Sequence, residues 1–207
     1  MKGKFITFEG CEGVGKSRQI RLLEDYLKNH GIKYFLTREP GGTDISEQIR
    51  RIILDGNNNA MTDECEALLY AAARAQLIND VILPRLENGE LVFCDRFVDS
   101  SLAYQGKARN LGYKFVEDVN SLAFNRCMPD LTLFLDLSPE LAFLRKGGVD
   151  VNDRLETSGE KFHEKVYQGY KEIAEKYKDR VVSIDASGTR EQTHAKIIAV
   201  LTEKGIL

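Results

Sequence analysis

Eight consecutive residues near the start of the chain match the phosphate-binding pattern G-x-x-x-x-G-K-[ST] at every fixed position. They are Gly10, Cys11, Glu12, Gly13, Val14, Gly15, Lys16 and Ser17, called here the phosphate loop. In such a loop the glycines let backbone N–H groups point at phosphate oxygens, and the following helix adds the partial positive charge of its N-terminus. The lysine reaches the β and γ phosphates of ATP, and the serine hydroxyl ligates magnesium. The segment therefore predicts an ATP-binding site rather than a glycine-rich turn that matches by chance.

Two further groups of charged residues follow apolar runs, Arg38-Glu39 after 33–37 and Asp95-Arg96 after 91–94. Phosphoryl transfer needs two anionic reactants held in line, with cations to offset their repulsion. A phosphate monoester acceptor needs no general base, because its second pKa is about 6 and it is already a nucleophile at neutral pH. The chain has no N-K-x-D motif and no D-x-x-G motif after a strand, which argues against a GTPase. These residues favour a kinase whose acceptor carries a phosphate.

Strand and helix patterns alternate along the whole chain. Apolar, β-prone runs predict strands at 4–8, 33–37, 91–94, 131–137 and 181–184. Apolar positions at helical spacing predict helices from 16 to about 30, 44–54, 63–86, 100–105, 114–126, from 139, 160–177 and 189–203. This order predicts an α/β protein with a three-layer α/β/α P-loop fold and a five-stranded parallel sheet. Ligands of such sheets bind beyond the carboxyl ends of the strands, so the phosphate loop, Glu39 and Arg96 should gather at one rim.

Composition sets the remaining bounds. The 207 residues, 43% of them hydrophobic, suffice for one core, so we expect a single domain over residues 1–207. The net charge of −3 gives no general attraction to nucleic acid or to an anionic membrane. Four scattered cysteines form no C-x-x-C pair, which argues against zinc and favours a reducing compartment. No signal-peptide pattern and no apolar run near 20 residues is present, so we predict a cytoplasmic protein.

Several longer motifs resemble those of the bacterial thymidylate kinases, within the P-loop nucleoside monophosphate kinases. These motifs are Phe8-Glu9-Gly10, residues 37–43 (TREPGGT), Asp95-Arg96-Phe97, residues 100–106 (SSLAYQG) and residues 129–132 (PDLT). The resemblance runs from the first strand to the last helix. It implies direct in-line transfer of a phosphoryl group from ATP to dTMP with Mg²⁺, giving dTDP for dTTP synthesis. It also implies a homodimer, which we expect to form through the helices after the first and third strands.

The resemblance further implies which residues hold dTMP. Tyr70 would stack on thymine and Arg74 would hydrogen-bond its O4, although an amphipathic helix with a buried Tyr and a solvated Arg is the alternative for this pair. Further contacts are implied for Ser101 and Gln105 (base edge), Tyr104 (beside the sugar, disfavouring a 2'-hydroxyl), Glu39 (3'-hydroxyl), Arg50 and Arg96 (acceptor phosphate) and Glu12 (between metal and acceptor). The family often has Phe at the position of Tyr70.

Metal and lid residues follow from the same resemblance. Ser17 and Asp95 would hold Mg²⁺, Asp95 through water, or Asp95 would orient Arg96. Because the phosphate loop contains no arginine, a catalytic arginine must come from a lid at about 145–157, where the candidates are Arg145 and Arg154. Glu156 would help to place the metal, and the Gly147-Gly148 pair departs from the family pattern. Arg18, at a position where the family often has Thr, is expected to point away from the phosphates.

Two other functions fit parts of the sequence. One is a kinase for a different acceptor, such as dUMP, CMP or a deoxynucleoside. The other is a binding module that uses ATP occupancy as a switch and transfers nothing. The switch has no need for a second phosphate and base pocket, so the set of Arg50, Tyr70, Arg74 and Arg96 argues against it.

Overall fold

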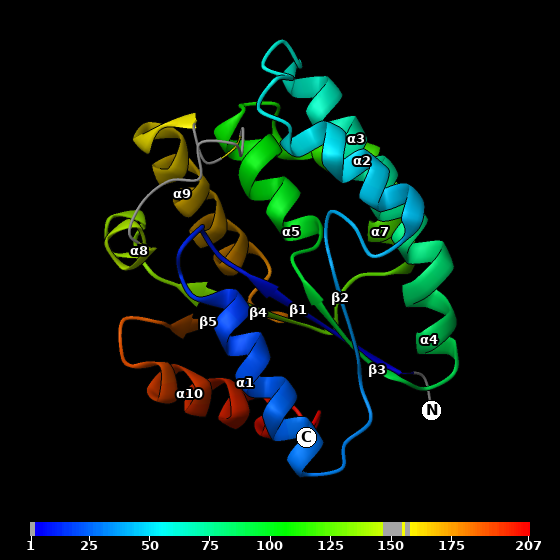
Figure 1. Cartoon of the computed structure of the whole chain (residues 1–207), viewed down its shortest axis with the longest axis vertical. Helices are drawn as coiled ribbons and strands as arrows, with labels where there is room; N and C mark the ends of the chain where they lie inside the picture. The colour runs from blue at the N-terminus through cyan, green and yellow to red at the C-terminus, as the bar shows by residue number, and fades with distance from the viewer. Residues whose placement is uncertain (1–2, 147–154, 156–157) are drawn as a thin grey trace.

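The computed structural model describes residues 3–146, 155 and 158–207. Its five strands are β1 (Lys4–Glu9), β2 (Phe35–Arg38), β3 (Leu91–Asp95), β4 (Leu131–Asp136) and β5 (Val181–Asp185). They form one sheet in the order β2-β3-β1-β4-β5, and every neighbouring pair is parallel (Figure 1). The prediction of a five-stranded parallel sheet is confirmed. Each strand lies within two residues of its predicted bounds.

Helices cover both faces of this sheet, which gives the predicted three-layer α/β/α fold. They are α1 (Lys16–Asn29), α2 (Asp44–Leu54), α3 (Asp63–Leu77), α4 (Leu83–Glu87), α5 (Val98–Ser101), α6 (Tyr113–Val119), α7 (Ser121–Arg126), α8 (Pro139–Lys146), α9 (Glu160–Lys176) and α10 (Arg190–Glu203), with π-helical turns η1 (Ile78–Ile82) and η2 (Leu102–Ala108). Figure 1 shows α1 and α10 on one face, and α4, α5 and α9 on the other. None of the described helices is long and apolar enough to cross a bilayer.

Three of the predicted helices are subdivided in the structure, and the shortest, 100–105, falls on the end of α5 and the start of η2. The predicted helix 63–86 consists of α3, η1 and α4, and Pro84 lies in the first turn of α4, where its missing N–H costs least. The predicted helix 114–126 is wrong as a single helix, because it breaks at Asn120 between α6 and α7. The Asn120 side chain donates to Val116 O at 2.9 Å and accepts from Arg74, so it takes part in a buried contact at this break.

The apolar core is arranged so that the carboxyl ends of the central strands stay polar. β1 and β4 are buried almost throughout, and Ile20, Leu23 and Leu27 of α1 pack against them. β1 and β3 end in Glu9 and Asp95, next to the phosphate loop. Burial by the apolar residues therefore fixes the strands and places three charged loops at one rim.

Candidate functional site

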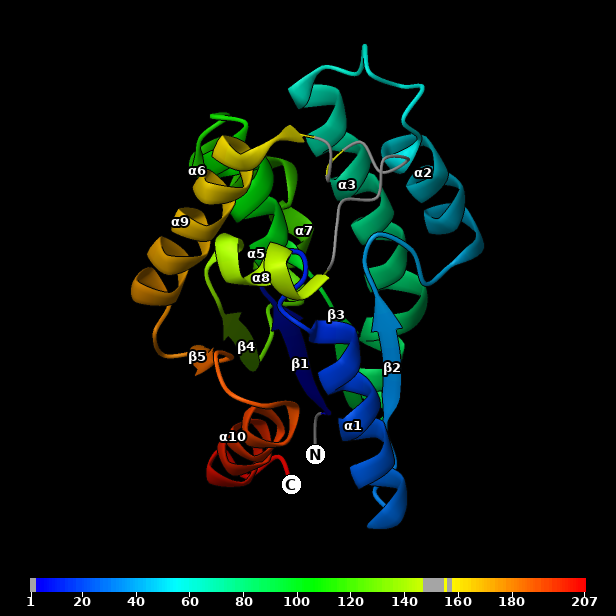
Figure 2. The same cartoon turned by 60° about the vertical axis from the view of Figure 1, so that its left-hand side comes forward.

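A cavity of about 530 Å³ lies at this rim. It brings together residues from β3, α1, α2, α3, α5, η2 and the loops after β1 and β2, which Figure 2 shows around the carboxyl ends of the strands. The predicted site residues that line it are Glu12, Gly13, Gly15, Lys16, Ser17, Glu39, Arg50, Tyr70, Arg74, Asp95, Arg96, Ser101, Tyr104 and Gln105. Gly10, Cys11 and Val14 form the buried underside of the phosphate loop. Residues predicted from six separate stretches of sequence therefore share one cavity.

The phosphate loop depends on glycine at its turns. Gly10 and Gly15 have φ angles of 141° and 95°, and a Cβ at Gly10 would lie 2.9 Å from Leu135 O. Lys16 begins α1 and donates to Gly10 O at 2.9 Å and to Cys11 O at 3.0 Å. Burial lowers the pKa of Lys16, and the positive charge of Arg96 acts in the same direction. The ammonium is thus held at the loop, where an added phosphate would favour its charged form.

Arg96 connects the phosphate loop to α5 and α9. Its backbone adopts a left-handed φ of 70°, and its N–H donates to Phe8 O at 2.9 Å. Its guanidinium donates to Gly10 O at 3.0 Å, to Tyr170 Oη at 3.1 Å and to the Glu12 carboxylate. A planar guanidinium between a phosphate loop and a second wall of the cavity is well placed to pair with phosphate oxygens.

Tyr170 contacts Arg96 on the protein side, and Glu9 contacts Tyr170. The sequence analysis assigned no role to either residue. Glu9 is fully buried and accepts from Phe97 N at 2.7 Å, Ser100 Oγ at 2.6 Å and Tyr170 Oη at 2.8 Å. Burial raises the pKa of Glu9, Asp99 acts in the same direction and Arg96 opposes both. An acidic residue that ends an apolar strand was the available sign for Glu9. Tyr170 gave none, because it occupies an apolar position of a regular amphipathic helix.

Glycine in α9 explains why a residue so distant in sequence reaches the site. A Cβ at Gly169 would lie 3.0 Å from Ala103 Cα and 3.0 Å from Lys107 Cβ, so α9 and η2 approach closely only with glycine there. Tyr170 follows Gly169 and stacks on Phe134, with ring centroids 5.2 Å apart. The close packing of α9 against η2 thus carries the Tyr170 hydroxyl to Arg96.

Arg74 lies in a buried polar network rather than in solvent. It is 2% exposed, so the alternative of a solvated Arg74 is wrong, whereas Tyr70 is half-buried at the cavity wall. Arg74 Nε donates to Glu39 at 2.7 Å, and Arg74 Nη2 donates to Phe97 O at 3.2 Å. Arg74 Nη1 donates to Ser101 Oγ at 3.0 Å and to Asn120 Oδ1 at 2.6 Å. Four protein groups therefore hold the Arg74 guanidinium at the wall of the cavity.

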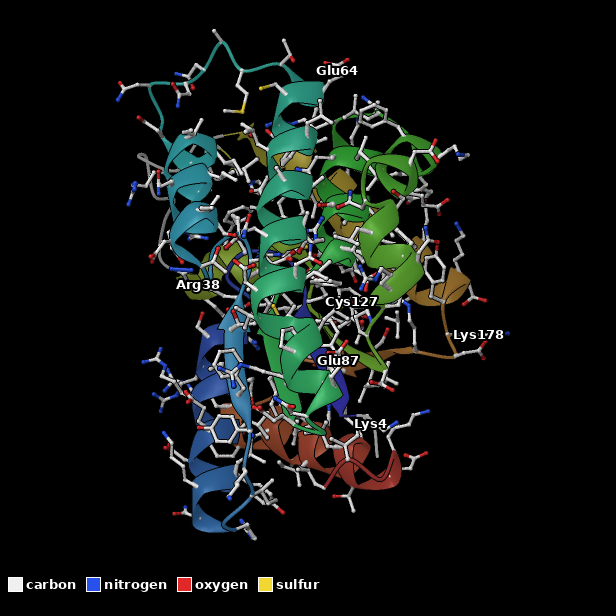
Figure 3. All side chains as sticks on the ribbon, turned by 90° about the vertical axis from the view of Figure 1, so that its right-hand side faces the viewer. Lys4, Arg38, Glu64, Glu87, Cys127 and Lys178 are labelled. Atoms are coloured by element: carbon white, nitrogen blue, oxygen red, sulfur yellow. The ribbon has the colours of Figure 1, made fainter. Side chains whose placement is uncertain are left out.

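Glu39 is the acidic partner of Arg74 and is itself buried. Burial raises the pKa of Glu39 to about 7 despite the neighbouring Arg74 charge. The Glu39 Oε1 atom accepts no hydrogen bond from the described part of the chain. The loop that follows is held to α2, because Arg50 Nη1 donates to Pro40 O at 3.0 Å and Arg38 pairs with Glu47 at 2.8 Å (Figure 3 labels Arg38).

Oxygen ligands for a magnesium ion are present at the start of α1, in Ser17, and at the end of β3, in Asp95. Asp95 Oδ1 is buried without a hydrogen-bond donor among residues 3–146, 155 and 158–207, and Ser17 is exposed at the helix N-terminus. Mg²⁺ prefers oxygen ligands and usually keeps waters and substrate phosphates in its shell, so one carboxylate and one hydroxyl fit it. The described residues contain no cluster of three His, Cys, Asp or Glu side chains that could hold a metal alone.

Arg145, one of the two arginines predicted for the lid, is not among the described residues that line the cavity. Arg145, at the end of α8, donates to Ala186 O at 2.7 Å and to Ser187 O at 2.6 Å, so its guanidinium is bound to the turn after β5. Arg154 and Glu156 lie outside the described residues. Arg18 and Arg21 also line the cavity.

Comparison with known proteins agrees with this arrangement. The family model described as thymidylate kinase matches residues 8–197. Curated thymidylate kinases of Finegoldia magna and Thermoanaerobacter sp. are 47% and 46% identical over 98% and 97% of this chain, covering 100% and 98% of their own length. That of Lactobacillus helveticus is 46% identical over 99% of this chain and 98% of its own. With a phosphate loop, a second cationic wall and near-complete alignment, the chain belongs to the thymidylate kinase family.

Proposed function

We propose that this enzyme transfers the γ-phosphoryl group of ATP to dTMP, giving ADP and dTDP, directly and in line with Mg²⁺, as a step of dTTP synthesis. The observation that carries the proposal is the cavity itself. The phosphate loop forms one wall, while Arg50, Tyr70 and Arg96 form a wall that can take a second phosphate and a flat base. A protein that only switches on ATP occupancy has no use for that second wall.

The geometry supports direct transfer between two bound nucleotides. The phosphate loop and Lys16 would hold the β and γ phosphates of ATP, while Arg96 and Arg50 would hold the acceptor phosphate on the opposite side. Arg96 contacts the phosphate loop already, through Gly10 O at 3.0 Å, so an acceptor phosphate on Arg96 would lie next to the donor. Mg²⁺, held through Ser17 and Asp95, would neutralise charge on the donor phosphates. The acceptor phosphate is itself the nucleophile, so no covalent enzyme intermediate is needed.

A coupled ADP-release assay tests the activity. We expect turnover with dTMP to exceed that with dUMP, CMP and thymidine. Lys16→Ala and Arg96→Ala should each lower turnover by about 10³ or more, because each removes a cation that would offset the charge of the reacting phosphates. Turnover near wild type in either variant would refute the site. Higher turnover with dUMP, CMP or thymidine than with dTMP would favour a kinase for that acceptor. A calorimetric titration in which dTMP gives no heat and no turnover would favour the ATP-dependent switch.

We also propose one domain over residues 1–207, a cytoplasmic location and a homodimer. All four cysteines are free, which supports a reducing compartment. Helices α1 and α5 follow the first and third strands, but exposed large apolar side chains occur on α8, at Leu141 and Leu144, and on the pair α2 and α3, at Ile45, Ile52 and Leu68. These two helices lie side by side (Figure 2), so this face supports association of two copies. Light scattering at several concentrations should give twice the mass of one chain, and Ile52→Lys should lower it.

A further inference from the structure

The side-chain amide of Gln105 is the best-placed acceptor on the base-binding wall of the cavity. Gln105 is 2% exposed and lines the cavity beside Tyr70 and Ser101. Its Nε2 donates to Glu66 Oε1 at 2.8 Å. No hydrogen bond from the described residues reaches its Oε1. One end of this amide is therefore committed to the protein and the other is available to a ligand.

Glu66 determines which end is committed. It lies on α3, is fully buried, and accepts from Arg109 Nη2 at 3.1 Å. Arg109 also lies 3.3 Å from Asp63 and stacks over Phe162 at 4.6 Å, so the guanidinium is held on several sides. A carboxylate paired with an arginine has no proton to donate, so only the NH₂ end of the Gln105 amide can face it. The carbonyl of Gln105 must then face away from Glu66.

The orientation of this amide distinguishes two classes of pyrimidine. Thymine and uracil carry an N–H donor at N3, whereas cytosine has an acceptor lone pair at N3. A Gln105 carbonyl beside N3 accepts a hydrogen bond from thymine or uracil. With cytosine, the carbonyl lone pair faces the lone pair of N3, and the two repel each other. A site built around one hydrogen bond rejects an analogue that cannot make it, because the buried polar groups are left unpaired.

We propose that Glu66, held by Arg109, is a positioning residue that fixes the Gln105 carbonyl as an acceptor and thereby selects pyrimidines with an N3–H. Glu66 contacts no substrate in this proposal. It acts only through the orientation of Gln105. The inference rests on the proposed function in one respect, that the acceptor base lies against Gln105.

Glu66→Gln tests the proposal, because an amide at position 66 can either accept from Gln105 or donate to it. The orientation of Gln105 is then no longer fixed. We measure kcat/KM for dTMP and dCMP in the ADP-release assay, and expect the dTMP-to-dCMP ratio to fall by at least about tenfold, the worth of one buried hydrogen bond. Glu64→Gln is the matched control, because it removes the same charge from an exposed position of the same helix (Figure 3). The dTMP-to-dCMP ratio of Glu64→Gln should stay at the wild-type value.

A double variant separates positioning from loss of structure. In Glu66→Gln/Gln105→Glu the pair is exchanged, so the carboxylate at 105 accepts from the amide at 66 and presents only an acceptor to the base. We expect the double variant to recover most of the dTMP preference lost in Glu66→Gln. An unchanged ratio in Glu66→Gln, or a double variant no more selective than the single one, would overturn the proposal. Wild-type protein that does not phosphorylate dTMP at all would instead overturn the proposed function.

Should Glu66→Gln fold too poorly to assay, the double variant decides by itself. It retains one carboxylate and one amide in the buried pair, and circular dichroism reports whether it is folded. If the folded double variant prefers dTMP, the orientation of the acceptor is what matters. If it accepts dCMP as well as dTMP, Gln105 does not read N3 through its carbonyl and the proposal fails.

Discussion

Removing the buried hydroxyl of Tyr170 should lower both the stability of the fold and kcat/KM for dTMP. In Tyr170→Phe the ring keeps its stacking on Phe134, but the hydroxyl that donates to Glu9 at 2.8 Å and accepts from Arg96 at 3.1 Å is lost. Hydrogen bonds to charged groups contribute about 1.5–3 kcal/mol each. Because Glu9 keeps donors from Phe97 and Ser100, and Arg96 keeps Gly10 O, we expect the total loss to be smaller than the sum of two such bonds, about 1.5–3 kcal/mol.

Tyr167→Phe is the matched control. It lies on the same helix and loses one hydrogen bond, of 2.9 Å, to Asp136, but it is half-buried and Asp136 keeps Lys171. Its loss should be about 0.5–1 kcal/mol. Urea unfolding followed by circular dichroism gives both values from the midpoints, provided that the slopes agree.

The same pair of variants tests the effect on Arg96. An acceptor-binding arginine that loses about 1.4 kcal/mol of transition-state stabilisation lowers kcat/KM for dTMP about tenfold. We expect that loss in Tyr170→Phe, with the KM for ATP nearly unchanged, and less than twofold in Tyr167→Phe. Equal stability and equal kinetics of the two variants would show that Tyr170 does not support Arg96.

The first of three further predictions concerns Glu39, whose folded pKa of about 7 lies above its ordinary value of 4.5. The native state therefore binds more protons than the unfolded state between these pH values, and the Glu39 contribution to stability falls by about 3 kcal/mol as pH rises from 4.5 to 7. Urea midpoints across this range should show that fall in wild type and not in Glu39→Gln. Chelation with EDTA should abolish turnover until Mg²⁺ is restored. Asp95→Asn should raise the Mg²⁺ concentration for half-maximal rate at least about tenfold. Equal Mg²⁺ dependence of wild type and Asp95→Asn would show that Asp95 does not hold the metal. Tyr104→Ala should raise kcat/KM for a ribonucleotide acceptor relative to dTMP, and an unchanged ratio would contradict a role for Tyr104 beside the sugar.

The sequence alone predicted the strands, the parallel sheet and most of the residues around the cavity. These features depend on local information, namely apolar runs, glycine at left-handed turns, and the rule that parallel strands end at one edge. The phosphate loop, Glu39 and Arg96 each follow a strand directly, so predicting the strands also predicted that these groups share a rim. The resemblance to a known family added roles for the helical residues, which periodicity could not supply.

Only the tertiary structure decided how the polar side chains pair. Arg74, predicted to contact the base, also joins Glu39, Ser101 and Asn120, which lie 35, 27 and 46 residues away in the chain. Tyr170 supports Arg96 across 74 residues, because Gly169 lets α9 approach η2.

The physical reason is that a buried charge must find partners wherever the packed core brings them. A side chain's spacing within one helix shows which face it occupies, but not which distant group faces it. The direction in which the Gln105 amide points is such a case, since it follows from Glu66 and Arg109 on neighbouring elements and from nothing in its own sequence motif.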